Sequence, residues 1–224
     1  ELAFSANYAP GATFARMNYL NSNFYTSSVY TDYTMEKENH YLKVMLGMNT
    51  EEYIVRSLSA QRSDVITSSI PEISASVGAD KINNDGNNPT QYKNWATAGF
   101  FGRINYTFKD RYLLEANLRY DGSSRFLRDQ RWNLFPSFSL GWRMSEENFM
   151  NSIKWLDMLK LRLSWGALGN NAVDNYEYQS VYNKDNYVLG NSVVPGLAQI
   201  QLANALVSWE TTYVTNIGLD FSLF

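Results

Sequence analysis

The clearest pattern in the chain is a period of two between Ala96 and Tyr120, in which apolar residues alternate with mostly polar ones and Phe101 is a large apolar residue on the polar side. It runs in two halves, which are separated by the polar residues Lys109–Arg111. A period of two is typical of a β-strand with one apolar face, and a short polar break between two such runs predicts a hairpin. The apolar positions are Ala98, Phe100, Gly102, Ile104, Tyr106 and Phe108 in the first half, and Tyr112, Leu114, Ala116, Leu118 and Tyr120 in the second.

The length and residue order of this predicted hairpin suit a membrane. Each half has about the ~9–11 residues that a tilted strand needs to cross a bilayer. Its apolar face carries aromatic rings at the ends and small or aliphatic residues in the middle, as a lipid-facing surface with aromatic girdles does. A half-buried hairpin of a soluble β-sandwich also alternates, so the hairpin by itself leaves both interpretations open.

Similar alternation, and for residues 28–36 a strand pattern with mixed faces, predicts six further strands, which make eight with the hairpin. They cover residues 2–8, 28–36, 41–62, 132–143, 159–168 and 207–224. Pro136 cannot donate a ladder hydrogen bond, so it is expected at a bulge or above the fully paired region. One helix is predicted over Ser145–Met158, because Ser145 can cap it and Glu146 and Glu147 suit its first turn.

The connections between these strands alternate between long and short. The short ones are Lys37–His40, Lys109–Arg111 and the helical segment Ser145–Met158, and the long ones are Ala9–Ser27, Ser63–Asn94, Asp121–Arg131 and Gly169–Leu206. Outer-membrane barrels have short turns on the periplasmic side and long loops outside, whereas a Greek-key sandwich has no reason to alternate in this way. The pattern therefore predicts an all-β fold, an antiparallel up-and-down transmembrane barrel with one short periplasmic helix.

Composition and isolated motifs argue against several classes of function. The 224 residues include no cysteine, which excludes disulfides, thiolate metal sites and cysteine nucleophiles, and the net charge of −3 gives no footprint for nucleic acid. His40 is the one histidine and has no carboxylate cluster near it in sequence, so it is expected as a turn residue. Adjacent acids such as Glu51 and Glu52 point to opposite faces of a strand. We therefore expect no enzyme, no cofactor and no metal.

Four long motifs, in this order and spacing, resemble one family. They are FFGRINYTFKDRYLLEANLRYDGSSRF (Phe100–Phe126), RWNLFPSFSLGWRMSEENFM (Arg131–Met150), WLDMLKLRLSWGALGNN (Trp155–Asn171) and VSWETTYVTNIGLDFSLF (Val207–Phe224). These motifs closely resemble the sequences of the SusC/RagA family of TonB-linked outer-membrane transporters. The likeness covers the second half of the chain well, whereas residues 1–95 match only loosely.

The resemblance implies a larger parent protein. Members of that family carry an N-terminal plug domain inside a 22-stranded barrel, and the matching motifs come from the middle of the barrel. Residues 1–224 are therefore expected to be about eight barrel strands, without the plug domain and the TonB box. The parent is expected in the cell outer membrane, importing oligosaccharides, or peptides in some members. Its implied partners are a SusD-like surface lipoprotein and the TonB complex, which acts through the plug region.

Two groups of residues are candidates for contacts inside or above such a barrel. The polar strand faces would point to the lumen, against substrate or plug, and the apolar faces to lipid. The lumen-facing candidates are Arg103, Glu115, Asn117, Arg119, Arg143 and Arg162, with Lys160, Glu210 and Asp220 beside them. In the last long loop, where a small hairpin is predicted over 176–182 and 187–189, the candidates for sugar contact are Tyr176, Tyr178, Tyr182 and Tyr187. Tyrosines also form ordinary cross-strand pairs.

Two other functions stay open at this point. A small passive outer-membrane barrel or adhesin is favoured by the aromatic Phe224 after an alternating run. A soluble β-sandwich that binds carbohydrate would keep the tyrosines but would not require the alternating connections. Asp121–Arg125 is polar enough for a binding loop, but a structured turn is the simpler expectation.

Overall fold

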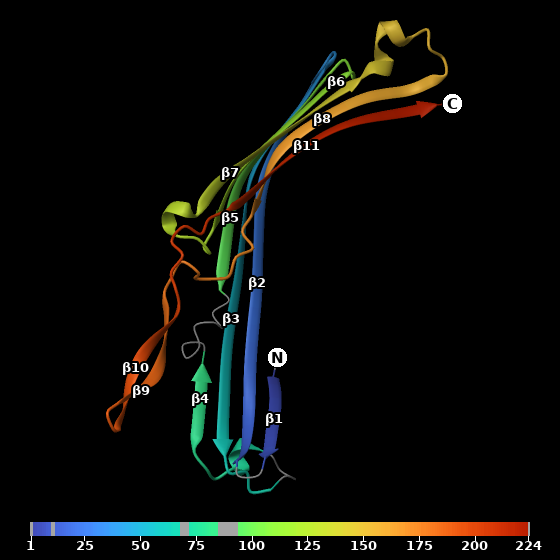
Figure 1. Cartoon of the computed structure of the whole chain (residues 1–224). Helices are drawn as coiled ribbons and strands as arrows, with labels where there is room; N and C mark the ends of the chain where they lie inside the picture. The colour runs from blue at the N-terminus through green and yellow to red at the C-terminus, as the bar shows by residue number, and fades with distance from the viewer. Residues whose placement is uncertain (1, 10–11, 68–71, 85–93, 224) are drawn as a thin grey trace. The chain divides into compact units, whose positions relative to one another are not determined.

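The fold is built almost entirely from β-strands, shown in Figure 1. The computed structural model describes residues 2–9, 12–67, 72–84 and 94–223. The strands are β1 (Leu2–Ala9), β2 (Ala12–Lys37), β3 (His40–Ser63), β4 (Asp80–Asn84), β5 (Trp95–Phe108), β6 (Tyr112–Ser123), β7 (Trp132–Arg143), β8 (Leu156–Asn170), β9 (Val181–Leu189), β10 (Ser192–Gln201) and β11 (Glu210–Leu223). In the described part of the chain, no helix is long and apolar enough to cross a membrane.

The main sheet has an up-and-down topology. Its strands are hydrogen-bonded in the order β1-β2-β3-β5-β6-β7-β8-β11, while β4 pairs with β3 beside this path and β9 and β10 form a two-stranded sheet. The pairs β5–β6, β6–β7, β7–β8 and β8–β11 are all antiparallel. Apart from β4, β9 and β10, neighbours in the chain are therefore neighbours in the sheet. This order confirms the predicted all-β, antiparallel fold class.

The chain divides into two compact units, whose boundary falls within β2 and β3. The first unit comprises Glu1–Tyr25 and Glu52–Trp95, and the second comprises Thr26–Glu51 and Ala96–Phe224. In the first unit the ring of Trp95 lies 6.2 Å from that of Phe24 and 6.1 Å from that of Tyr53. The second unit contains the predicted hairpin and most of the candidate residues.

Connections in the second unit lie alternately at the two ends of the strands. The β5–β6 turn lies at the same end as the 3₁₀ turns η5 (Met144–Glu146) and η6 (Asn148–Met150), as Figure 1 shows. The β6–β7 connection, with the 3₁₀ turn η4 (Arg128–Gln130), joins the other ends of its strands. The predicted alternation of connection lengths holds for the tight β5–β6 turn and the long β8–β11 connection, but residues 124–131 between β6 and β7 are fewer than residues 144–155 between β7 and β8. We name the two ends of the strands the short and the long connections after the β5–β6 turn and the β8–β11 connection.

The helix predicted over Ser145–Met158 was wrong. The segment forms η5 and η6 and then enters β8 at Leu156. Neither 3₁₀ turn has a side-chain cap. Glu147, predicted in the first helical turn, instead accepts hydrogen bonds from residues at the ends of β6 and β7. A helix that short is marginal without packing on one face, and these bonds favour two separate turns.

The predicted loop at Ala9–Ser27 was also wrong, because β2 is a continuous strand of 26 residues. β1 pairs with its first part, from Leu2 opposite Tyr19 to Ala9 opposite Ala12. Asparagine and serine lower β propensity, but ladder pairing with neighbouring strands outweighs that preference. The predicted loop Ser63–Asn94 contains β4 and a 3₁₀ turn over Ile73–Ala75. Its turn signals at Pro71 and at positions 85–89 lie outside the described residues.

Few side chains of the second unit are fully buried, and they gather near the long connections. Phe126 is completely buried, and Phe135 and Ala167 nearly so. The Trp209 ring lies 5.5 Å from that of Phe126 and 5.2 Å from that of Phe135, and its indole nitrogen donates to the Arg131 carbonyl at 2.8 Å. Through these contacts the chain just before β11 packs against the β6–β7 connection and the start of β7.

Aromatic rings also lie over glycines in the sheet. Gly122 faces Trp132 across β6 and β7, and a Cβ on Gly122 would lie 2.7 Å from ring atoms of that tryptophan. The Trp132 ring stacks on Tyr120 at 5.0 Å and on Phe100 at 6.1 Å between centroids. Glycine at this position therefore makes room for a stack of three rings.

We predict that Gly122→Val lowers the free energy of unfolding by about 1–3 kcal/mol, because the new side chain must displace a packed indole. Gly218→Val is the matched control, since a Cβ there meets only the flexible guanidinium of Arg162, at 3.2 Å. Urea unfolding of the full-length protein in detergent measures both. Equal costs at the two glycines would contradict this role for Gly122.

Candidate functional site

The sheet of the second unit has one continuous apolar face. Register places Tyr106, Leu114, Leu140, Leu163 and Ile217 in a single row across β5, β6, β7, β8 and β11. Residues opposite one another in a ladder point to the same side, and so does every second residue along a strand. We call this face the apolar belt. It also includes Phe100, Ile104, Tyr112, Ala116, Leu118, Tyr120, Phe138, Trp142, Leu161 and Trp165.

Aromatic rings bound the apolar belt at both ends of the strands. Tyr120 and its stacked partners lie toward the long connections, and Tyr112, stacked on Phe108 at 6.3 Å, lies toward the short ones. The eight steps from Tyr112 to Tyr120 span about 26 Å at ~3.3 Å per residue. A strand tilt of ~40° projects this to about 20 Å, close to the ~25 Å apolar band of outer-membrane barrels.

The opposite face is polar, and three predicted lumen-facing residues form one network on it. Arg103 donates from Nε to Asn117 Oδ1 at 2.6 Å, and Asn117 donates from Nδ2 to Glu115 Oε1 at 2.9 Å. The guanidinium of Arg103 lies 4.0 Å from the Glu115 carboxylate. The three side chains come from the adjacent strands β5 and β6 and hold one another in place.

Arg119 belongs to a second polar cluster. Its guanidinium donates to both oxygens of Asp121, at 3.0 and 2.8 Å, and to Asn49 Oδ1 at 3.1 Å. It also lies 5.5 Å from the centre of the Phe101 ring. A Cβ on Gly99 would come within 2.1 Å of Asp121 Oδ1, so glycine leaves the space that this carboxylate occupies.

The remaining two arginines of the predicted set lie on β7 and β8. Arg162 lies opposite Gly218 and forms an ion pair with Asp220, with Nε 2.7 Å from Oδ2. Arg143 lies opposite Lys160 in the β7–β8 ladder. Arg162 is thus neutralised by an acid on β11, whereas Arg143 faces a like charge. In the three pairs Arg103–Glu115, Arg119–Asp121 and Arg162–Asp220, one acid offsets one arginine. These pairs give the polar face hydrogen-bond donors and acceptors with little net charge.

The four candidate tyrosines do not form one platform. The rings of Tyr176 and Tyr178 lie 6.4 Å apart in the turn before β9. Tyr182 and Tyr187 are five positions apart on β9 and so point to opposite sides of the β9–β10 sheet. Tyr187 donates to the Leu197 carbonyl at 3.0 Å and covers Gly196. The hairpin predicted from 176–182 and 187–189 instead forms from β9 and β10.

The segment Asp121–Arg125, predicted as a structured turn, is the end of β6 as far as Ser123, and the turn begins at Ser124 and Arg125. Ser123 is fully buried, and Ser124 and Ala96 exchange two hydrogen bonds, at 2.9 and 2.8 Å. Arg125 donates to the Asn171 carbonyl at 2.9 Å and to Asn175 Oδ1 at 3.1 Å. Burial lowers the pKa of Arg125. These bonds join the β6–β7 connection to the one that follows β8.

Sequence reasoning missed the part that Glu147 plays at the short connections. Its carboxylate accepts hydrogen bonds from Tyr112 Oη at 2.6 Å, Trp142 Nε1 at 3.0 Å and Arg111 Nη1 at 3.2 Å. The bonds from Tyr112 and Trp142 hold the pKa of the Glu147 carboxyl below its usual value, and Arg111 adds to the shift. Tyr112 and Trp142 are opposite one another in the β6–β7 ladder. This pairing depends on the strand register and cannot be read from the sequence alone.

The acidic residues and the single histidine of the described strands are not gathered into one cluster. Among the described residues, no group of three or more His, Cys, Asp or Glu could hold a metal ion. His40, predicted as a turn residue, begins β3 and shares a 2.8 Å hydrogen bond with the hydroxyl of Tyr106. The candidate site is therefore the sheet itself, with the apolar belt on one face and the polar clusters on the other.

A family model described as "TonB dependent receptor-like, beta-barrel" matches residues 2–224. The chain belongs to this family. Its members are receptors and transporters, and enzymes are not among them. Within the family the chain resembles a barrel segment of the SusC/RagA type, as the four sequence motifs predicted.

Relatives and solved structures agree with the family. The "TonB-dependent receptor SusC" of Bacteroides thetaiotaomicron is 42% identical over 127 residues, which are 54% of this chain and 13% of that protein. The "TonB-dependent receptor P39" of Formosa agariphila is 41% identical over 143 residues, 64% of this chain and 13% of that protein. This TonB-dependent receptor chain therefore covers a small part of the length of these relatives.

The RagAB peptide importer in its closed-closed state shares the fold, with a TM-score of 0.78 at 23% identity, covering 95% of this chain and 23% of that one. The RagAB peptide transporter gives a TM-score of 0.73 at 24% identity. At these identities the similarity shows that this chain and the two solved structures share the same strand arrangement.

We predict that Glu147→Gln lowers the thermal unfolding temperature of the intact receptor at pH 7. The folded-state pKa of Glu147 is depressed, so the stability that its charge contributes is complete above the ordinary glutamate pKa of about 4.3. That contribution is lost as the pH falls through the lower folded-state value. The difference between native and variant receptor should therefore be largest at neutral pH and should vanish in acid.

Glu146→Gln is the control, because that neighbouring carboxylate is exposed and should give no difference at any pH. Thermal unfolding followed by circular dichroism between pH 3 and pH 7 measures both variants. A difference for Glu147→Gln that stays constant down to pH 3 would contradict the role of its charge.

Proposed function

We propose that this chain is part of the barrel wall of a TonB-energised outer-membrane transporter that imports oligosaccharides or peptides. One observation carries the proposal: the row Tyr106-Leu114-Leu140-Leu163-Ile217 is apolar throughout, whereas most of the residues next to it along the strands, which point to the other face, are polar or charged. A sheet with those two faces fits a wall between lipid and a wet interior. The apolar belt then faces lipid.

The polar face is proposed to line the lumen. Arg103, Glu115, Asn117 and Arg119 are held by hydrogen bonds to neighbours on the same face, and Arg162 is held by Asp220. Such a fixed, nearly neutral set suits contact with a polar plug, water or a hydroxylated substrate. Arg143 completes the proposed lumenal set. We assign residues 1–224 wholly to the barrel domain. The TonB complex would act through a plug region outside these residues.

Two lines of support bear on partner and substrate. The SusC/RagA resemblance implies a SusD-like surface lipoprotein and oligosaccharide import, and the structural neighbour RagAB is described as a peptide importer. We take oligosaccharides first, because identity to SusC is 42% and identity to RagAB is 23%. Tyr176 and Tyr178 are the proposed sugar contacts of the last long loop, with Tyr182 and Tyr187 on separate faces of the hairpin.

The structure bears on both alternatives. A β-sandwich needs two sheets packed face to face, whereas the described strands form one long sheet and a separate two-stranded hairpin. A small passive barrel is disfavoured because the family model extends over residues 2–224 as a receptor barrel. Active import through TonB is the feature that separates the proposed function from a passive pore.

Growth of the source cell on panels of oligosaccharides and of peptides tests the proposal. Deleting the receptor gene should abolish growth on one class of long substrate and leave growth on monosaccharides unchanged, because small solutes need no energised importer. A strain that lacks TonB should show the same loss. Loss of growth after deletion of the receptor but not of TonB would contradict active import and favour a passive pore.

A further inference from the structure

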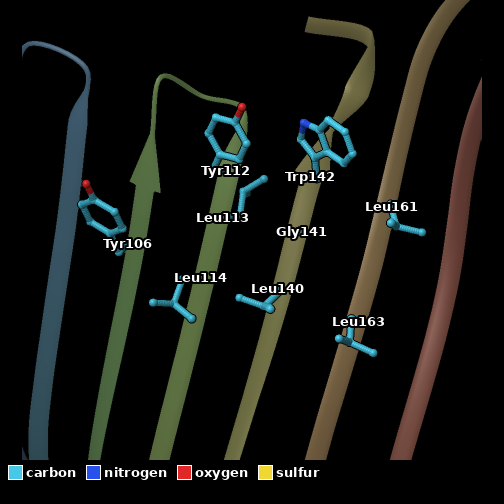
Figure 2. A pocket seen from close by; sticks show the side chains of 9 residues that line it. All are labelled: Tyr106, Tyr112, Leu113, Leu114, Leu140, Gly141, Trp142, Leu161 and Leu163. Carbon is cyan, nitrogen blue, oxygen red and sulfur yellow. The ribbon is translucent and has the colours of Figure 1, made fainter. Parts of the chain in front are cut away.

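An apolar groove runs along the belt near the short connections. It has a volume of about 580 Å³, within the ~300–1,000 Å³ range of ligand sites. Leu114, Leu140 and Leu163 form its floor, with Tyr112 and Trp142 at its rim, as Figure 2 shows. The lining is almost entirely apolar. The groove therefore suits a hydrocarbon chain and offers little to a sugar or a peptide.

The polar atoms of the rim are already engaged. Tyr112 Oη and Trp142 Nε1 both donate to Glu147, and Tyr106 Oη lies 2.8 Å from His40 Nδ1. Figure 2 shows the hydroxyls of Tyr106 and Tyr112 at the end where the β5–β6 turn lies. These bonds turn the polar edges of the rings toward the turn and leave their carbon atoms along the groove.

A cation lies at the same end. Lys109 Nζ is 5.3 Å from the centre of the Phe108 ring, which in turn stacks on Tyr112. Arg111 on the same turn is neutralised by Glu147 at 3.2 Å, but no carboxylate of the described residues pairs with Lys109. An unpaired positive charge beside an apolar groove is complementary to an amphiphile with a negative head.

We propose that this groove is a specific phospholipid site, with an acyl chain over Leu114, Leu140 and Leu163 and the phosphate at Lys109. The inference rests on the proposed function, because it takes the apolar belt to face lipid. Short turns of outer-membrane barrels lie on the periplasmic side, so the bound lipid belongs to the periplasmic leaflet. The aromatic rim then marks the depth at which head groups begin.

Native mass spectrometry of the intact receptor, titrated with palmitoyl-oleoyl-phosphatidylglycerol, tests the acyl part. Leu140→Trp fills the groove and should weaken the tightest lipid by about tenfold, since losing about two buried methylenes at ~0.8 kcal/mol each corresponds to that factor. Leu163→Trp should have the same effect. Leu118→Trp is the matched control, because Leu118 lies on the same face and outside the groove, with 49% exposure against 45% for Leu140.

Lys109→Gln tests the head-group part, with dioleoylglycerol as the ligand that lacks a phosphate. The native receptor should prefer the phospholipid, and the variant should bind both ligands equally. Lys184→Gln, on β9, is the control and should keep the preference. An unchanged preference in Lys109→Gln would overturn the assignment of the phosphate to that lysine.

Two outcomes would overturn the lipid site itself. One is equal lipid retention in Leu140→Trp, Leu163→Trp and Leu118→Trp. The other is a receptor dimer that Leu140→Trp abolishes, since that would assign the groove to a second copy of the chain. Lipid binding is read as bound mass and uptake as growth, so a groove that fails to retain lipid in a receptor that still imports would overturn this inference and leave the proposed function intact.

Discussion

The constraint on which this structure depends is that one layer of strands is held together by continuous ladder pairing between neighbours and has two unlike faces. A backbone group without a partner costs several kcal/mol in hydrocarbon, so neighbouring strands must run side by side along their length, as β5, β6, β7, β8 and β11 do. With the ladders fixed, only the side chains can distinguish the faces, and a period of two follows. Three features follow from that geometry. They are the aromatic rings at both ends of the apolar belt, the paired charges of the polar face and the glycines beneath aromatic rings.

The two faces solve different problems. On the apolar face Leu118 and Leu140 remain 49% and 45% exposed, with no second layer of described residues packed over them. On the polar face each of three arginines is matched by one acid, so charge is neutralised locally without closing the surface to hydrogen bonds. Fully buried side chains occur instead near the long connections, where Phe126, Phe135 and Trp209 hold irregular chain to the sheet.

The sequence predicted what the period of two controls and missed what depends on pairing. Alternation predicted the hairpin 96–120, the strand 41–62 and the placement of Leu118 and Arg119 on opposite faces of the sheet. The structure confirms all three. The residues around Asn18 lack that signal and are a strand only because neighbouring strands complete their ladder. Glu147 looked like the first turn of a helix, because its true partners, Tyr112 and Trp142, are brought together only by the β6–β7 register. The loop tyrosines could be found by composition, but their separation onto different faces required the β9–β10 pairing.

The most direct measurement of the central claim compares two adjacent residues on opposite faces of β6. Ala116 lies midway along the apolar belt, between Ile104 and Phe138 in the ladders, while Asn117 lies on the polar face. Denaturant titration of the intact receptor folding into phospholipid bilayers gives the stability of each arginine variant. If the apolar belt faces lipid, Ala116→Arg should cost roughly 2–4 kcal/mol near the bilayer midplane, and Asn117→Arg should cost clearly less. Equal costs at the two positions, or a larger cost for Asn117→Arg, would contradict a wall with one lipid face and one wet face.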